Sequence, residues 1–268
     1  MNSTRTPFHT SFLTLAGSVY LVALTSSAHA APLTSWVQGA GTGSTQLNTN
    51  TPVLGNTAQA IYAVSSSAYT LAVGDSLKFS GDVTFVGVSA ANTADQFRFG
   101  IYDSNGQSTS FGWLGYMASN SGTSGGPTYS RLWERDNPNT ANFHQNGTGQ
   151  ATMDAFANAS PSNTAFASGS YTFSLSYTRT ASGLSITWNL IGTDLNYSVS
   201  STFLDNTAQT FTFDRVGLAV LGLGTSQTNF SNLDLTYTPV AVPEPAIASL
   251  LFAGLLVFAL RRRYSTQP

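Results

Sequence analysis

Two acidic side chains, Glu134 and Asp136, stand at a spacing that suits catalysis. Glycoside hydrolysis needs two carboxyl groups about 5–10 Å apart, and residues two apart on a β-strand share a face at about 6–7 Å. Arg135 lies between the two acids, which favours a solvated charge cluster instead. We therefore predict no catalytic residue and keep a divergent glycoside hydrolase as the alternative.

The sequence contains few side chains that could support thiol catalysis or bind a metal ion. The chain has no cysteine and three histidines, so cysteine catalysis and sites built from cysteine ligands are excluded. His9 and His29 lie in an N-terminal segment that we expect to be removed, and His144 stands in a polar stretch typical of the surface. Residues 136–142 carry oxygen groups that suit Ca²⁺, but at no ordered ligand spacing. We predict no metal site and no cofactor.

Aromatic residues near the middle of the chain favour binding over catalysis. Sugar sites combine an aromatic platform with a few polar groups. The candidates for such a site are Trp113, Tyr116, Trp133, Arg131 and Asn142. The alternative is that Trp113 and Trp133 belong to the core or the edge of the fold.

Alternating apolar and polar residues predict the elements that position these side chains. The clearest case is residues 170–190, where two alternating arms flank a turn at residues 180–183. Period-2 alternation on both arms is typical of a β-hairpin with one buried face. Similar short strands recur from residue 69 to residue 237. We predict an all-β, two-sheet β-sandwich with jelly-roll topology over residues 59–238, entered through a flexible Gly/Ser/Thr-rich segment at residues 31–58.

The charge balance of this body excludes one class of partner. Between residues 31 and 240, six basic residues stand against eleven acidic ones, a net charge of −5. Nucleic acid binding needs clustered lysine and arginine, so we expect no nucleic acid partner.

The C-terminal residues 239–268 have the organisation of a membrane-directed signal. Residues 246–260 are uncharged and end in Arg261, Arg262 and Arg263. This helix would be about 22 Å long, short for a hydrocarbon core of about 30 Å, but arginines can snorkel to the headgroups. We predict a transmembrane helix with its arginine end in the cytoplasm; a buried core helix is the alternative.

Pro243, Glu244 and Pro245 precede this span. The two prolines keep the backbone extended and unpaired, as a linker or a processing site requires. With the apolar span and the arginine block, this motif resembles the PEP-CTERM sorting signal. The resemblance implies processing near residues 243–245 by an exosortase of a Gram-negative bacterium that makes exopolysaccharide. It implies no particular activity of the body.

Residues 1–30 are predicted to be a signal peptide. An apolar run over residues 12–24 is followed by Ala28 and Ala30 at the small-x-small spacing of a cleavage site. Signal peptidase and the general secretion machinery are therefore expected partners, and an uncleaved signal anchor is the alternative. The two end signals together predict an inner-membrane intermediate with its body outside, followed by the cell surface or extracellular matrix.

The strand rhythm itself resembles concanavalin A-like (laminin-G-like) jelly rolls, in residues 97–102, 170–190, 213–218 and 232–237. Members of that superfamily bind glycans, hydrolyse glycans or serve as adhesion modules. Its glucanases carry a second glutamate after a Glu-x-Asp pair, and the segment after Glu134 lacks it. We expect a non-catalytic, exported surface protein associated with polysaccharide. The alternatives are a divergent glycoside hydrolase and a purely structural coat protein.

Overall fold

A computed structural model describes residues 28–55, 58–88, 96–121, 130–135, 143–144, 151–152, 167–195, 197–240 and Leu255. The predicted signal peptide up to residue 27, the predicted sorting motif at residues 243–245, Asp136 and Asn142 lie outside these residues. So does the predicted helix over residues 246–260, apart from an exposed, helical Leu255. Within the described residues, no helix is long and apolar enough to cross a membrane.

Sheet A is antiparallel, and β14 is one of its interior strands. In spatial order it contains β1 (His29–Pro32), β14 (Gln227–Thr238), β5 (Ser76–Val86), β10 (Gly169–Thr180), β11 (Gly183–Gly192) and β12 (Ser198–Asp205). The short β3 (Val53–Gly55) also pairs with β14.

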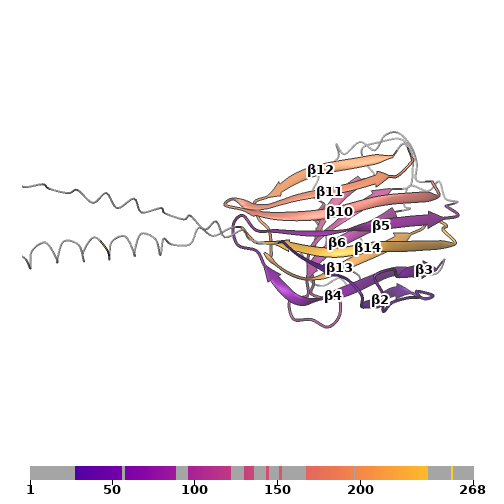
Figure 1. Ribbon diagram of the computed structural model, residues 1–268, viewed down its shortest axis with the longest axis horizontal. Coiled ribbons are helices and arrows are strands. Elements are labelled where there is room, and N and C mark those ends of the chain that lie inside the picture. The colour runs from indigo at the N-terminus through magenta and orange to yellow at the C-terminus, as the bar shows by residue number, and fades with distance from the viewer. Residues whose placement is uncertain are drawn as a thin grey trace, which may run out of the picture. The chain divides into compact units, whose positions relative to one another are not determined.

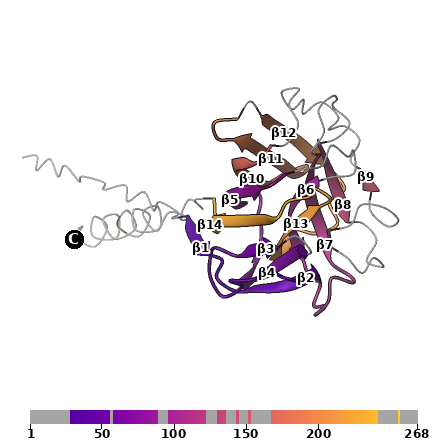
Figure 2. The ribbon, with the colours of Figure 1, turned by 90° about the vertical axis from the view of Figure 1, so that its right-hand side faces the viewer.

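Sheet B is antiparallel as well and packs against sheet A (Figures 1 and 2). Its order is β2 (Trp36–Gly41), β4 (Ala58–Thr70), β13 (Thr212–Leu221), β6 (Gln96–Asp103), β7 (Leu114–Ser121), β8 (Ser130–Arg135) and β9 (Ala151–Thr152). The predicted all-β sandwich is confirmed.

Alternation places one set of side chains from each strand between the sheets. Phe79 of β5 and Phe173 of β10 pack edge to face at 5.3 Å, and Phe97 of β6 meets Phe173 from the other sheet at 5.5 Å. Such edge-to-face pairs add about 0.5–1.5 kcal/mol each beyond the burial of their area. The core between the sheets is therefore largely aromatic.

The predicted hairpin is confirmed as β10 and β11, which pair from Tyr171 opposite Gly192 to Thr180 opposite Gly183. Gly183 has a φ of +155°, and a Cβ there would lie 1.9 Å from the Asp205 carbonyl oxygen. Only glycine fits this close approach of β12 to the hairpin turn.

The predicted flexible entry over residues 31–58 contains strands. Its described residues, 31–55 and 58, include the end of β1, all of β2 and β3, and the first residue of β4. These strands pair with both sheets, through β14 and β4. The glycines and hydroxyl residues that suggested a loop lie partly within these short strands.

Candidate functional site

The outer face of sheet B carries a second apolar cluster, separate from the core between the sheets. Its buried members are Ala60, Tyr102, Trp113, Met117, Phe143 and Ala219, and Trp133 packs against its rim. Phe143 stacks on Trp113 with ring centroids 5.6 Å apart. A Cβ on Gly39 or Gly217 would lie within 2.7 Å of the Phe143 ring, so the two glycines make room for this residue on the sheet.

Two arginines lie within the same layer. Arg98 donates to the carbonyl of His144, while Arg135 donates to the carbonyls of Trp113 at 3.0 Å and Ser110 at 2.9 Å. Burial lowers the pKa of Arg98 to about 10, so its guanidinium stays charged at neutral pH. Backbone carbonyls thus accept hydrogen bonds from buried charged groups.

His144 is buried, with 2% of its surface exposed, so the expectation of a surface histidine was wrong. Burial, followed by the positive charges of Arg98 and Arg135, lowers the pKa of His144 to about 4. The imidazole is therefore neutral at physiological pH. Its Nδ1 has no hydrogen-bond partner among the described residues.

The structure separates the residues predicted to bind glycan. Trp113 is fully buried in the outer cluster, while Trp133 and Arg131 are half-buried on the same face, with the Arg131 guanidinium 5.9 Å from the Trp133 ring centroid. Tyr116 points the other way, into the core between the sheets. Asn142 lies outside the described residues, and the assignment of these five to a glycan site stays a prediction.

Glu134 also faces the inter-sheet core. The Tyr116 hydroxyl lies 2.6 Å from Asp205 Oδ2 and 3.2 Å from Glu134 Oε1, and burial together with these acids raises its pKa. Glu134 is 5% exposed and Arg135 is fully buried. The predicted solvated charge cluster was therefore wrong for both residues, which occupy opposite faces of β8.

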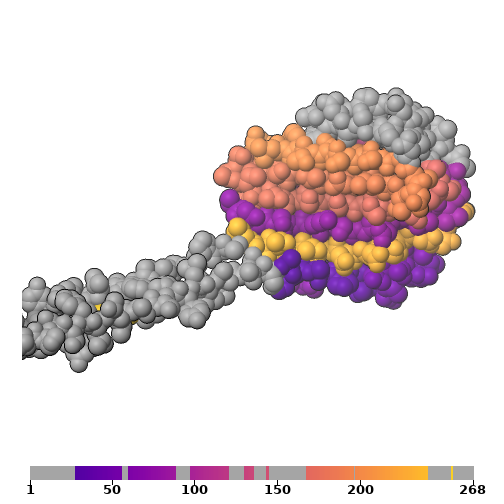
Figure 3. All heavy atoms as spheres, turned by 45° about the horizontal axis from the view of Figure 1, so that its top comes forward, coloured from indigo at the N-terminus to yellow at the C-terminus, as the bar shows by residue number. Residues whose placement is uncertain are grey.

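The outer face of sheet A has a different chemistry, because it presents small hydroxyl side chains. They are Ser80, Thr84, Ser170, Thr172, Ser174, Ser176, Thr178, Ser185, Thr187, Ser198, Ser200, Thr202 and Thr236, all exposed or half-buried. In Figure 3 the strands of this sheet form adjacent bands from yellow β14 through purple β5 to orange β12. Cross-strand register brings hydroxyls together, as in Thr187 to Thr202 at 2.8 Å and Thr84 to Ser170 at 2.9 Å.

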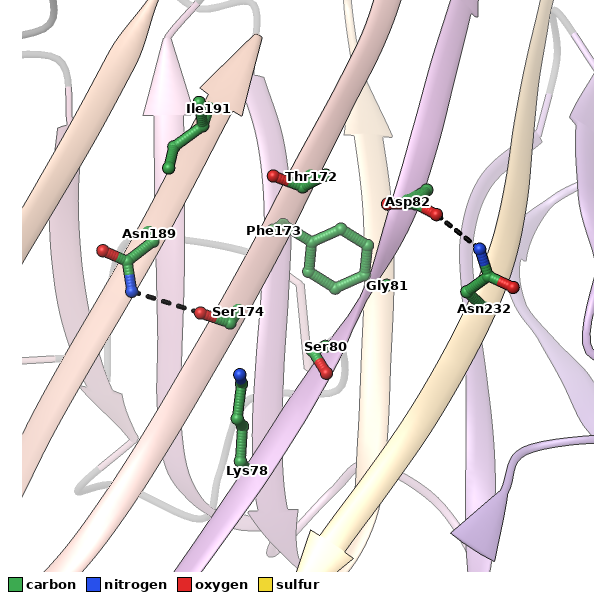
Figure 4. Close-up of a pocket in the computed structure, with 10 residues that line it drawn as sticks. All are labelled: Lys78, Ser80, Gly81, Asp82, Thr172, Phe173, Ser174, Asn189, Ile191 and Asn232. Carbon is green, nitrogen blue, oxygen red and sulfur yellow. Dashed lines mark hydrogen bonds between the residues drawn. The ribbon is translucent and has the colours of Figure 1, made fainter. Parts of the chain in front are cut away.

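A shallow hollow of about 390 Å³ lies on this face (Figure 4). Its polar lining consists of Lys78, Ser80, Asp82, Thr172, Ser174, Asn189 and Asn232, and Ile191 adds an apolar side. Asn189 donates to the Ser174 hydroxyl at 3.1 Å, and Asn232 donates to Asp82 Oδ2 at 2.6 Å. The hollow therefore brings an ammonium, a carboxylate, two amides and several hydroxyls together.

A β-bulge shapes this hollow. The register of β14 against β5 shifts between Ser231 and Asp234, and Asn232 adopts a φ of +52°. Opposite the bulge, a Cβ on Gly81 would lie 2.4 Å from Leu233 Cδ2. Glycine thus lets Leu233 pass into the core, while Asn232 turns outward to Asp82.

Sequence reasoning did not find this hollow. Its one available signal is Lys78, the single lysine of the chain, within a strand whose outward positions are polar. The bulge that turns Asn232 toward Asp82 leaves no recognisable pattern, because nothing in the alternation marks the register shift.

Comparisons with known proteins concern the fold alone. No family model and no curated protein matches the sequence. Among solved structures, peanut lectin is similar at 12% identity with a TM-score of 0.43, covering 80% of this chain and 97% of the lectin. Lectin I from Ulex europaeus, solved with the methyl glycoside of α-L-fucose, is similar at 11% identity and 0.44, covering 79% and 98%. The carbohydrate recognition domain of Emp46p is similar at 14% identity and 0.41, covering 76% and 88%.

Proposed function

We propose that this chain is an exported, non-catalytic surface or matrix protein that associates with exopolysaccharide through the outer face of sheet A. The observation that carries the proposal is the hollow around Lys78, Asp82 and Asn189, set within a field of hydroxyl side chains. Processing at residues 243–245 by an exosortase, after removal of residues 1–30 by signal peptidase, delivers the body beyond the inner membrane. This sorting rests on the sequence motifs at the two ends.

The chemistry of the hollow suits sugar hydroxyls. A sugar hydroxyl both donates and accepts, and so do serine, threonine and asparagine side chains. Lys78 adds a donor and Asp82 an acceptor at opposite sides of the same hollow (Figure 4). With one cation and one anion in the lining, the site favours an uncharged glycan over a strongly acidic one.

Binding of the full-length protein to immobilised exopolysaccharide tests the site. We expect the triple variant Lys78→Ala, Asp82→Ala, Asn189→Ala to lose about tenfold or more in affinity, since it removes three polar groups whose contacts are worth about 0.5–1.5 kcal/mol each. Ser108→Ala with Thr109→Ala, in the exposed loop between β6 and β7, is the matched control. Unchanged binding by the triple variant would refute this site. Release of reducing ends that is lost on Glu134→Gln would instead indicate a hydrolase.

The intact mass of the protein recovered from the cell envelope tests the sorting. Loss of residues 1–30 and of the chain beyond residues 243–245 is the expected result. An unprocessed chain in the cytoplasm would contradict it.

A further inference from the structure

Asp75 is a buried carboxylate at the turn between β4 and β5, and 4% of its surface is exposed. It accepts three hydrogen bonds. One comes from the Ala72 amide of its own turn, at 2.8 Å. The others come from the end of the domain, from the Tyr237 hydroxyl at 2.7 Å and the Val240 amide at 2.7 Å. One carboxylate therefore joins this turn to the residues through which the chain leaves the sandwich.

The turn that carries Asp75 is itself fixed. The Gly74 amide donates to the Arg179 carbonyl at 2.8 Å, and the Arg179 amide donates to the Asp75 carbonyl at 3.0 Å. The side chain of Val240 packs over Gly74, where a Cβ would lie 3.0 Å from it. Gly74 also needs its lack of a side chain for a φ of +96°. Backbone hydrogen bonds from the end of β10 thus fix the turn, and the turn fixes Val240 through Asp75 and Gly74.

This attachment limits how far the processing motif can lie from folded structure. Pro243 follows Val240 by three residues, and a chain extends by at most about 3.6 Å per residue, so the two Cα atoms are at most about 11 Å apart. A protease that binds extended backbone needs free residues before its cut as well as after it. While Val240 is held, only Ala241 and Val242 stand between it and Pro243 in the sequence.

We propose that Asp75 forms a latch on residues 237–240, and that opening of this latch controls the access of the processing protease to residues 243–245. The inference rests on the sorting proposed above. Proteolysis of a transiently opened segment follows the population of the open form when opening is fast. The rate of processing therefore rises with the fraction of molecules in which Tyr237 and Val240 have left Asp75.

The latch is tested first by hydrogen exchange of the full-length protein in detergent. Asp75→Asn removes the charge but keeps the shape, and we expect the Val240 amide to exchange about tenfold faster, because hydrogen bonds to charged groups are the stronger ones. Asp194→Asn is the matched control: this exposed aspartate lies in the turn after β11, at the opposite end of the sheet. Equal exchange in wild type and Asp75→Asn would overturn the latch.

Processing in cells, followed by pulse-chase and intact mass, tests its role. We expect Asp75→Asn to be processed faster by a factor close to the rise in exchange. A Gly/Ser spacer of about six residues after Val240, which frees the motif without opening the latch, should also speed processing. Faster exchange with unchanged processing would overturn the access role. A chain that stays unprocessed in wild type and spacer variant alike would refute the proposed sorting, and with it the access role, whatever the exchange shows.

Discussion

The two outer faces of the sandwich differ in where their polar groups lie. On sheet B, Tyr102 and Trp113 are buried against Phe143, and the buried Arg135 donates to backbone carbonyls. On sheet A, short hydroxyl side chains stand at the surface and bond to each other across strands. The aromatic cluster on sheet B is buried like a protein core, whereas the hydroxyl side chains of sheet A are exposed or half-buried.

This difference shows why residue type alone is a poor guide to a binding surface. Tryptophan is prominent in sugar sites, yet Trp113 is fully buried and cannot present its face to a ligand in this conformation. Ser174, Asn189 and Asp82 are less conspicuous in the sequence, yet they line the hollow on the outer face of sheet A. Burial decides which chemistry a face can offer.

The largest expected effect comes from removing Trp113. Because Trp113 packs within the outer cluster of sheet B, Trp113→Ala should lower the free energy of unfolding by about 3–5 kcal/mol in urea titrations. Thr172→Ala on the outer face of sheet A is the matched substitution and should cost less than about 0.5 kcal/mol. A small effect of Trp113→Ala would break the comparison, because Trp113 would then behave as a surface residue.

A second effect concerns pH and His144. Its pKa falls from 6.5 when unfolded to about 4 when folded, through burial and the nearby Arg98 and Arg135. The unfolded chain therefore binds the proton more readily between these values, so stability is complete above pH 6.5 and declines as the pH falls toward 4. One pKa unit is worth about 1.36 kcal/mol, so the decline is roughly 3 kcal/mol at most.

Urea unfolding measured from pH 7 to pH 4 checks this expectation, with His144→Gln as the comparison. The variant should show a shallower dependence of stability on pH over this range. An unchanged dependence would mean that His144 titrates freely and that the layer over sheet B is open to water.

The smallest expected effect lies on sheet A. Thr187 and Thr202 bond through their hydroxyls at 2.8 Å on the exposed face. Replacing both with valine keeps their shape and removes two hydroxyls, so the free energy of unfolding should change by about 0.5 kcal/mol or less. Retention on immobilised exopolysaccharide should nevertheless fall, because the hydroxyl face loses two contacts. A stability loss above about 2 kcal/mol would show that these threonines serve the fold.

Much of the fold was predictable because a strand with one buried face shows alternating apolar and polar residues in the sequence. The hairpin of β10 and β11 follows its alternation closely, from Tyr171 to Leu190. Where both faces of a strand carry a large apolar side chain, alternation does not say which face is turned inward. In β8 hydrophobicity favours Trp133 for the interior, yet Leu132 and Glu134 face the other sheet, and Tyr116 gives Glu134 a hydrogen-bonding partner there.

The candidate site was less predictable than the fold. Its hollow depends on the bulge at Asn232, on Gly81 opposite and on the register between β5, β10 and β11, all of which are relations between distant segments. Local pattern carries no information on such relations. The sorting motif is the reverse case: it is evident from short-range order in the chain, and its role stays a prediction.

The interior position of β14 has a mechanical consequence for a protein held by its C-terminal end. β14 is paired with β5 along one side and, along the other, with β3 and with Ala31 and Pro32 of β1, which remain after the proposed removal of residues 1–30. Tension applied through Val240 along the strand axis therefore strains both ladders at once, in shear, and does not peel the strand from an edge one pair at a time. A protein held at Val240 therefore resists a force along the β14 axis, because the hydrogen bonds of both ladders must break together.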